Sequence, residues 1–597
     1  MTTSSGGDAP RTLAALLLRT TRRHPSAPAV SDGERALDYA ELTRRARHLA
    51  QELAARGIGR GERVGVLLPR SADTIVAVSG VLLAGAAYVP VDVQYPAARR
   101  AQLLRDARVA LVLTAPEWAR GIGELSVPVW EWDGSVPEGV AGAGAGPVAI
   151  EPADAACVLF TSGSTGAPKG MVLEHRHMAS FALDPAIPTL EPGDRTAQTA
   201  SISFDTFTFE MWRSVAGGAE IVVLPAIADL IGMDLQRQLR RRRITAMLAP
   251  ATALNHIVRY DREAFSPLRV LCSGGDVLLP ATTRDLRDGG FRGHLFNLYG
   301  PTEGTVACTA HPLGEHGESA DTVPIGFPLR QARLYVLDER LGHVPRGGAG
   351  ELYLAGAGVG RGYFDRPAQT AARFVADPFA ADGTRMYATG DLVRVRDDGA
   401  LEFLGRADSQ VKISGHRIEP AEVERLLCAR AGVRSAAVLA PGPAGDRRLV
   451  AFVVPAEAGL LLRDLRASLA ADVPSYMVPA EFVVIEEMPM DAHGKRDWGR
   501  LRELLEERAA ARRAYVTPRT ETERRLVRYW EDLLAQERVG AADDFFTLGG
   551  HSMLAVRLRM IIRRDLGISV PPESLFENSV LADQAKMLDD YREVVGR

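Results

Sequence analysis

Residues 158–170 read VLFTSGSTGAPKG, and this stretch indicates the fold more clearly than any other part of the chain. Its first three residues are apolar and predict a buried strand, and the next six are small or hydroxylated. Glycines let a backbone turn its N–H groups toward an anion, hydroxyls add donors, and a lysine adds positive charge. The stretch therefore predicts a polyphosphate-binding loop with these contacts: Thr161, Ser162, Gly163, Ser164, Thr165, Gly166 and Lys169.

The spacing within this loop differs from that of a P-loop NTPase. A P-loop has the form GxxxxGK[ST], whereas here Pro168 stands directly before Lys169 and Gly170 follows it. We therefore expect a phosphate-binding loop of another type.

Strands and helices alternate on both sides of this loop. Residues 61–69 (GERVGVLLP) and 268–275 (LRVLCSGG) predict buried strands, and residues 71–84 (SADTIVAVSGVLLA) predict a helix. This alternation is typical of an α/β fold with a largely parallel sheet. Around 341–365 the chain becomes glycine-rich with short strands, which indicates an antiparallel section, and from about 408 a smaller α+β pattern begins.

The last part of the chain predicts a separate helical domain. Residues 505–520 (LEERAAARRAYVTPRT) are charged, rich in alanine and end in Thr-Pro, which favours a linker. Thr520 and Glu523 have the spacing of a capping box. The amphipathic run that follows them places Leu526, Trp530, Leu533 and Leu534 on one face.

Composition limits the classes of function. The chain has 597 residues, 46% of them hydrophobic and 24% charged, as in an ordinary globular protein of several domains. A net charge of -4 gives no case for binding nucleic acid. The four cysteines form no CxxC pair, which fits a reducing, cytoplasmic location, and no run of 18 apolar residues predicts a membrane span.

The phosphate loop resembles the TSGSTGxPKG signature of the adenylate-forming superfamily. This superfamily includes acyl- and aryl-CoA ligases, luciferases and the adenylation domains of nonribosomal peptide synthetases. The resemblance continues in order along almost the whole chain and ends with a peptidyl carrier segment. The motifs that carry it are LDYAEL (37–42), LLAGAAYVPVD (82–92), FDTFTFEM (204–211), NLYGPTEG (297–304), GELYLAGAGVGRGYF (350–364), YATGDL (387–392), GRADSQVKISGHRIEPAEVE (405–424), VPSYMVP (473–479), HGKRDW (493–498) and DDFFTLGGHSM (543–553).

The resemblance implies four parts in chain order. They are an adenylation core over 1–407, a small mobile α+β subdomain over 408–508, a linker over 509–519 and a four-helix-type carrier domain over 520–597. Asp408 matches the hinge position. Ser552, which follows two glycines and opens a predicted helix, matches the attachment site of 4'-phosphopantetheine.

The resemblance also implies roles in activating a carboxylate with ATP and Mg²⁺. Lys495 would bridge the negative carboxylate and phosphate, with Arg406 as a second catalytic cation, and Glu303 would bind the metal. Tyr299 would stack on adenine and Asp391 would accept from the ribose hydroxyls. The further ATP contacts that it implies are Asn297, Thr302, Arg406 and Lys495, together with the glycine loop.

Asp205 indicates the class of substrate. It lies in an apolar strip, where an unpaired carboxylate would be costly, and the α-ammonium of an amino acid would supply the partner. The resemblance places the remaining pocket at Thr206, Phe209, Leu248, Leu271, Ser273, Leu298, Val306 and Ala307. This set has no charged member, so we expect a neutral, mainly apolar side chain of small to medium size. Aliphatic, phenylglycine-like, serine and cysteine substrates all remain open.

Two alternatives remain open at this stage. One is an acyl- or aryl-acid ligase fused to a carrier, and the other is an inactive scaffold that only presents the carrier arm. No condensation motif HHxxxDG occurs, so we expect a stand-alone loading didomain whose tethered amino acid passes to separate condensation or tailoring enzymes. A phosphopantetheinyl transferase must modify Ser552, and residues 373–394 resemble adenylation domains that need an MbtH-like partner.

Overall fold

The computed structural model describes most of the chain and divides it into two compact units. The described residues are 10–119, 122, 125–135, 148–163, 167–231, 234–314, 321–408, 410–413, 415–442, 447–457, 460–490, 496–511, 516–534, 536, 538–546, 548, 550, 552–571, 574–575 and 578–595. The first unit comprises Met1–Ile227, Leu235–Glu419 and Ala470–Pro474, and the second comprises Ala228–Asp234, Pro420–Leu469 and Ser475–Arg597.

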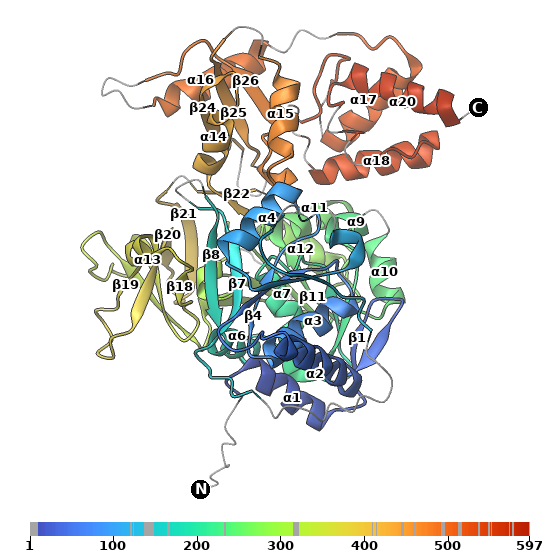
Figure 1. Ribbon diagram of the computed structural model, residues 1–597. Helices are drawn as coiled ribbons and strands as arrows, with labels where there is room; N and C mark the ends of the chain where they lie inside the picture. The colour runs from blue at the N-terminus through green and yellow to red at the C-terminus, as the bar shows by residue number, and fades with distance from the viewer. Residues whose placement is uncertain are drawn as a thin grey trace. The chain divides into compact units, whose positions relative to one another are not determined.

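A nine-stranded sheet forms one layer of the first unit (Figure 1). Its order is β15-β14-β13-β12-β11-β9-β10-β1-β2, and it is parallel from β13 to β1. The carboxyl ends of these parallel strands therefore meet at one edge, where α/β folds place their sites. The strands are β1 (Pro28–Ser31), β2 (Ala36–Asp38), β9 (Arg195–Gln198), β10 (Glu220–Val223), β11 (Ala246–Pro250), β12 (Val270–Gly274), β13 (His294–Tyr299), β14 (Thr309–Leu313) and β15 (Phe327–Pro328).

A seven-stranded sheet forms a second layer and carries the phosphate-loop sequence. Its order is β18-β8-β7-β4-β3-β5-β6, with β7 and β8 antiparallel to each other. The strands are β3 (Arg63–Leu67), β4 (Ala87–Pro90), β5 (Leu111–Thr114), β6 (Val129–Glu131), β7 (Ala155–Thr161), β8 (Lys169–Glu174) and β18 (Gly362–Tyr363). The predicted α/β class with largely parallel sheets is confirmed.

Helices cover these two sheets, and the first three pack on one another (Figure 1). The helix over Ala72–Leu83 is buried along most of its length because its residues are apolar on every side. The helices are α1 (Leu13–Arg23), α2 (Tyr39–Ala55), α3 (Ala72–Leu83), α4 (Ala97–Asp106), α5 (Pro116–Ala119), α6 (His175–Ala182), α7 (Thr206–Thr208), α8 (Ser214–Gly217), α9 (Ile227–Ile231), α10 (Leu235–Arg241), α11 (Ala251–Tyr260), α12 (Pro280–Asp288) and α13 (Pro367–Arg373).

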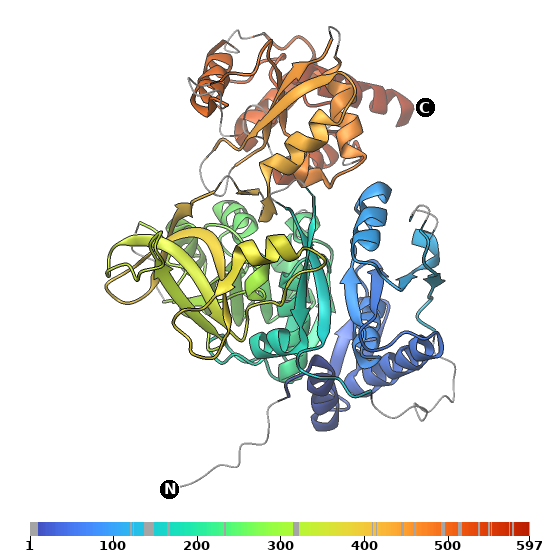
Figure 2. The ribbon, with the colours of Figure 1, turned by 60° about the vertical axis from the view of Figure 1, so that its left-hand side comes forward.

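The glycine-rich section forms a third, antiparallel sheet, as predicted (Figure 2, yellow). A short hairpin of β22 (Val411–Ile413) and β23 (His416–Ile418) follows it and still belongs to the first unit. The strands of the third sheet are β16 (Ala332–Leu337), β17 (Ala349–Gly356), β19 (Phe374–Ala376), β20 (Arg385–Val395) and β21 (Leu401–Arg406).

The second unit holds a small α+β layer and a helical part (Figure 2, orange and red). The helical part has its own apolar core, in which Trp530 packs edge-on against Phe545. The predicted capping box at Thr520 and Glu523 is present, with both backbone N–H groups bonded by the partner's side chain. The elements are β24 (Val433–Leu439), β25 (Val450–Pro455), β26 (Glu481–Val484), α14 (Pro420–Cys428), α15 (Leu462–Ala470), α16 (Trp498–Ala511), α17 (Glu521–Leu534), α18 (Ser552–Leu566) and α20 (Leu581–Val595).

The predicted linker over 509–519 begins in a helix. Helix α16 runs to Ala511, so the first residues of the 509–519 linker are helical. The reason is composition, because alanine, glutamate and arginine are strong helix formers and no proline interrupts the run before Pro518. The described part of the chain contains no helix that is both long and apolar enough to cross a membrane.

Candidate functional site

The phosphate-loop sequence connects two antiparallel strands of the seven-stranded sheet. Thr161 ends β7 and pairs in register with Lys169, which begins β8. The Thr161 Oγ1 atom is buried and has no hydrogen-bond partner in the described part of the chain. An orphaned buried hydroxyl is costly, so it suits a site that a ligand completes. Ser162 is buried too, and its Oγ donates to the carbonyl oxygen of Arg417 at 2.7 Å.

Glu303, the predicted metal ligand, lies at the centre of a buried charge cluster. Its side chain is 0% exposed and accepts hydrogen bonds from Tyr363 Oη at 2.7 Å and Arg417 Nη1 at 2.9 Å. Lys169 Nζ lies 3.2 Å away and also donates to Tyr363 Oη. Burial alone would raise the pKa of Glu303, but the Arg417 and Lys169 charges outweigh burial and hold it well below the usual range.

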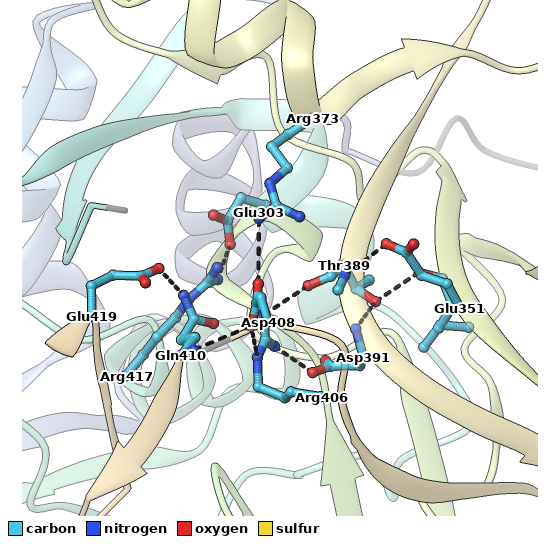
Figure 3. A network of polar contacts seen from close by, with 12 residues as sticks. Glu303, Glu351, Arg373, Thr389, Asp391, Arg406, Asp408, Gln410, Arg417 and Glu419 are labelled. Atoms are coloured by element: carbon cyan, nitrogen blue, oxygen red, sulfur yellow. Dashed lines mark hydrogen bonds and ion pairs between the residues drawn. The ribbon is translucent and has the colours of Figure 1, made fainter. Parts of the chain in front are cut away.

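A second network joins the predicted ribose carboxylate to the predicted hinge (Figure 3). Asp391 accepts hydrogen bonds from Tyr299 Oη and from Arg406 Nη1. Arg406 also makes a bidentate pair with Asp408, at 2.7 and 2.8 Å. Burial opposes ionisation of Asp408, yet the Arg406 hydrogen bond keeps its pKa low. Arg406 therefore connects the ribose position to the hinge position directly.

Asp205 stands at the start of helix α7 and lacks a cationic partner. Its Oδ2 accepts a hydrogen bond from Thr302 Oγ1 at 2.6 Å. Within the described residues no lysine, arginine or histidine forms an ion pair with it. Burial raises its pKa and the nearby Glu303 charge adds to that effect, although the Thr302 hydrogen bond and the Lys412 charge oppose it in part. An ammonium group from a ligand would relieve both costs.

Glu210 fixes the segment that leads into Asp205. Its buried carboxylate accepts hydrogen bonds from the backbone N–H groups of Thr199 at 3.0 Å and Ala200 at 3.1 Å, and from Gln198 Nε2 at 3.1 Å. Burial raises the pKa of Glu210 to about 7, although these donors oppose the shift. The folded state therefore binds a proton at Glu210 that the unfolded chain releases near pH 4.5.

This shift predicts a pH dependence of stability. The folded-state pKa is raised, so the contribution is complete below about pH 4.5 and is lost as the pH rises through about 7. The full change is on the order of 2–3 kcal/mol. Calorimetry between pH 5 and 8 should show the thermal midpoint of the first unit falling with pH more steeply in the wild type than in Glu210→Gln. Equal slopes would contradict the assignment.

Five of the predicted pocket residues pack together on one side of the nine-stranded sheet. Phe209, which starts the π-helical turn Phe209–Arg213, lies in one buried apolar cluster with residues of the strands β11 and β13. The turn after β13 holds Thr305 and Val306 at φ 57° and 70°, values that β-branched residues rarely adopt. Such strain is typical of functional sites. The predicted residues that share or border this cluster are Phe209, Leu248, Leu298, Val306 and Ala307.

Leu271 and Ser273 do not join that cluster. The pairing of β11 with β12 sets Leu248 beside Cys272, so these two side chains share one face of the sheet. Leu271 and Ser273 alternate with Cys272 and face the other side. In a strand, a step of one residue moves a side chain to the opposite face, and Cys272 is the β12 residue that belongs to the apolar cluster. Leu271 and Ser273 stay predicted pocket residues, and the buried Ser273 Oγ has no hydrogen-bond partner within the described residues.

The remaining predicted residues have other contacts or lie outside the described part. Asn297 donates from Nδ2 to the carbonyl oxygen of Pro324 at 2.8 Å, and Thr206 is half-buried next to Asp205. Ser552 is the first residue of α18, as predicted, but its side chain is not described. The predicted residues outside the described part are Ser164, Thr165, Gly166 and Lys495.

Four contributors were not singled out from the sequence. Glu210 and Tyr363 stood inside quoted motifs, but nothing in their spacing marked a buried carboxylate or a phenol between two charges. Arg417 and Lys412 lie in the segment assigned to the hinge region, and only the folded hairpin brings them to Glu303 and Tyr299. A count of buried charges that need partners would have indicated an arginine near Glu303.

Comparison with known protein families gives three matches along the chain. Residues 17–364 match the family of AMP-binding enzymes. Residues 422–495 match the C-terminal domain of AMP-binding enzymes, and residues 524–588 match the phosphopantetheine attachment site.

Large synthetases contain segments similar to this chain. Malpibaldin synthetase of Mortierella alpina is 38% identical over 95% of the chain, which covers 10% of that protein. Gramicidin S synthase 2 of Brevibacillus brevis is 35% identical over 97% of the chain, which covers 13% of that protein. The chain thus spans about a tenth of the length of the curated relatives it matches.

Solved structures of similar architecture are also known. Holo-PA1221, described as a nonribosomal peptide synthetase protein containing adenylation and PCP domains bound to a vinylsulfonamide inhibitor, matches with a TM-score of 0.80 and 28% identity over 97% of both chains. Holo-AB3403, a four-domain nonribosomal peptide synthetase bound to AMP and glycine, matches with a TM-score of 0.58 and 31% identity, covering 97% of this chain and 43% of that one.

Proposed function

The chain belongs to the AMP-binding enzymes, as an adenylation and carrier didomain of the nonribosomal peptide synthetase type, and on this premise we propose that it activates an amino acid with ATP and loads it onto its own carrier domain. The observation that carries the amino acid assignment is Asp205. Within the described residues its carboxylate forms no ion pair, and it accepts a hydrogen bond from Thr302, the residue before Glu303. A zwitterion fits there with its ammonium group at Asp205.

The family implies ATP, Mg²⁺ and covalent 4'-phosphopantetheine as cofactors. The described residues include groups that are suited to bind ATP and Mg²⁺. The buried Thr161 hydroxyl lacks a partner, as expected for a group that a phosphate oxygen completes. Glu303 offers the carboxylate oxygens that Mg²⁺ prefers. No group of three acidic, histidine or cysteine residues that could hold a metal is found in the described ranges. The bound metal would neutralise phosphate charge.

The chain's own residues divide the work of the reaction. The glycine loop and Thr161 orient the phosphates, while the Asp391 and Tyr299 pair holds the nucleoside. Arg406 supplies positive charge beside Asp391, and Lys495 offsets the repulsion between the substrate carboxylate and the phosphate. Ser552 carries the phosphopantetheine thiol that takes the amino acid from its adenylate, releasing AMP.

The apolar cluster supports a neutral, mainly apolar side chain of small to medium size. None of the predicted pocket residues besides Asp205 is charged, and burying a charged side chain against them would leave it unpaired. Leu271 and Ser273 stay in the proposed pocket, so the similarity to pockets for serine or cysteine stays open. Aliphatic and phenylglycine-like residues remain the favoured classes.

The two alternatives predict different chemistry. An acyl- or aryl-acid ligase has no need of a carboxylate such as Asp205. An inactive scaffold would not need to keep Glu303 and Asp391 in two buried networks of charged side chains. The test is ATP–pyrophosphate exchange over a panel of amino acids and matched acids without the amine. We expect exchange with a neutral amino acid and none with its desamino acid. Exchange with the acids, or none at all, would refute the proposal.

We further propose partners that act before and after loading. A phosphopantetheinyl transferase must convert Ser552 to its holo form. Condensation or tailoring enzymes would then act on the tethered amino acid. The four free cysteines, three of them buried, suit the reducing cytoplasm as the location.

An MbtH-like protein is a third proposed partner. Near residues 373–394 an open hollow of ≈ 540 Å³ is lined by Ala371, Phe374 and Arg385 among others, and Phe379 is 40% exposed against Tyr335. Co-expression with an MbtH-like protein should raise the soluble yield and the exchange rate severalfold. Equal yield and activity without that protein would remove it from the account.

A further inference from the structure

The β22–β23 hairpin contacts several residues that we propose bind ATP or the amino acid, or that stand next to such residues. Lys412 Nζ lies 5.7 Å from the ring centre of Tyr299, the proposed adenine platform. The His416 ring lies 4.8 Å from that of Phe204, the residue before Asp205. These residues all belong to the first unit, so the contacts do not depend on how the two units are arranged.

Arg417 makes the two most specific contacts of this hairpin. Its backbone carbonyl accepts from Ser162 Oγ at 2.7 Å, which occupies one hydroxyl of the phosphate loop. Its guanidinium binds Glu303 at 2.9 Å, with 16% of the Arg417 side chain and 0% of the Glu303 side chain exposed. Figure 3 shows the Arg417 guanidinium extending from β23 to Glu303, beside the Arg406 and Asp408 pair.

Glu303 cannot hold this arginine and a metal ion in the same way. Its Oε1 already bonds Tyr363 and lies near Lys169, and its Oε2 bonds Arg417. A buried carboxylate needs compensating positive charge, and Lys169 alone supplies one. Either Arg417 or Mg²⁺ can supply a further positive charge at Oε2, the arginine through a charge-assisted hydrogen bond and the metal through coordination of the same oxygen.

We propose that Arg417 is a positioning residue that takes the place of Mg²⁺ at Glu303 whenever the nucleotide is absent. This inference rests on the proposed function of Glu303 as the metal ligand. Arrival of Mg²⁺ with ATP releases Arg417 and, through its carbonyl, frees Ser162 for phosphate. Departure of the metal with pyrophosphate lets Arg417 return. The hairpin directly follows the hinge position Asp408 in the chain, so this exchange links metal occupancy to the segment next to the hinge.

The exchange predicts a specific effect on nucleotide affinity. Because of this competition, the apparent affinity is the intrinsic affinity multiplied by the fraction of molecules in which Glu303 is free. In Arg417→Gln the competitor is absent, so the dissociation constant of ATP with Mg²⁺ should fall about tenfold if the pair is closed in about nine molecules in ten. In EDTA, ATP binds without a metal ion and does not compete with Arg417 for Glu303. Its dissociation constant should therefore change far less. The measured quantity is the ratio of the two constants, obtained by calorimetric titration of the full chain.

Arg394→Gln is a matched control. Arg394 also binds a glutamate through a charged pair, Glu402 at 2.5 Å, but this pair lies in the antiparallel sheet away from Glu303. The control should leave the ratio of constants unchanged. The proposal would be overturned if Arg417→Gln left the ratio unchanged or raised both dissociation constants equally. An equal rise would show that Arg417 binds phosphate instead.

A second measurement needs no variant. Hydrogen–deuterium exchange over residues 411–418 of the wild type should accelerate when ATP and Mg²⁺ are added, because a detached two-stranded hairpin is only marginally stable. ATP in EDTA should produce little change. Slower or unaltered exchange with ATP and Mg²⁺ would overturn the proposal. Failure of the wild type to bind ATP at all would refute the proposed function itself, so the two failures are distinguishable.

Discussion

Replacing Asp205 with asparagine is expected to lower kcat/KM for amino-acid-dependent pyrophosphate exchange on the order of a hundredfold or more. The change removes the charge that faces the substrate ammonium and keeps a side chain that can still bond Thr302 Oγ1. Truncating one member of a desolvated charge pair costs about 2–5 kcal/mol, since the other charge stays buried and unpaired. Because the ammonium is bound in both ground and transition states, most of the loss should appear in KM.

Two controls separate this effect from misfolding. Asp261→Asn removes an exposed carboxylate of the same unit and should leave exchange unchanged. The dissociation constant of ATP measured without amino acid should be the same for Asp205→Asn and the wild type, because the nucleotide carries no ammonium group. A similar rate with amino acid for the variant and the wild type would show that Asp205 does not hold the amine.

Replacing Lys495 with alanine is expected to have the second large effect, on adenylate formation. The substrate carboxylate and the α-phosphate are both negative, and a cation between them stabilises the charge that shifts in the transition state. Losing one such electrostatic contact in a closed site typically costs on the order of 10²–10³ in rate. The loss should appear in kcat of pyrophosphate exchange, with ATP binding changed far less.

The partial reactions distinguish this role from a general loss of structure. Lys495→Ala should still transfer an amino acid from supplied aminoacyl adenylate to the holo carrier at close to the wild-type rate, because that step forms no bond to phosphate. Arg500→Ala, which removes an exposed cation paired with Glu507 on α16, should leave both steps intact. Equal loss of both partial reactions in Lys495→Ala would contradict the assignment.

The fold was predictable from sequence because local patterns agreed with the global arrangement. The apolar run at β3, the helix α3 and the strand β12 all appear where periodicity placed them. The capping box at Thr520 was predictable since it depends on two residues at fixed spacing. The end of α16 was not, because a charged, alanine-rich run suits both a helix and a linker.

The candidate site was predictable only in part. Motif order indicated Asp205, Glu303, Asp391 and Arg406, and the structure brings them into buried polar networks. The face of the sheet on which Leu271 lies depends on the pairing of β11 with β12, and the sequence alone did not show it. The Arg417 pair joins positions 114 residues apart, and only the folded hairpin determines it.

The most direct test of the account is the mass of the Ser552 peptide after a loading reaction. The holo protein would be incubated with ATP, Mg²⁺ and the amino acid that gives the highest exchange, then digested and analysed by mass spectrometry. We expect the peptide to carry phosphopantetheine plus one aminoacyl group, which a thiol reagent releases, and Ser552→Ala to carry neither. A holo peptide that stays unloaded with every amino acid, or that loads only acids without an amine, would contradict the central claim.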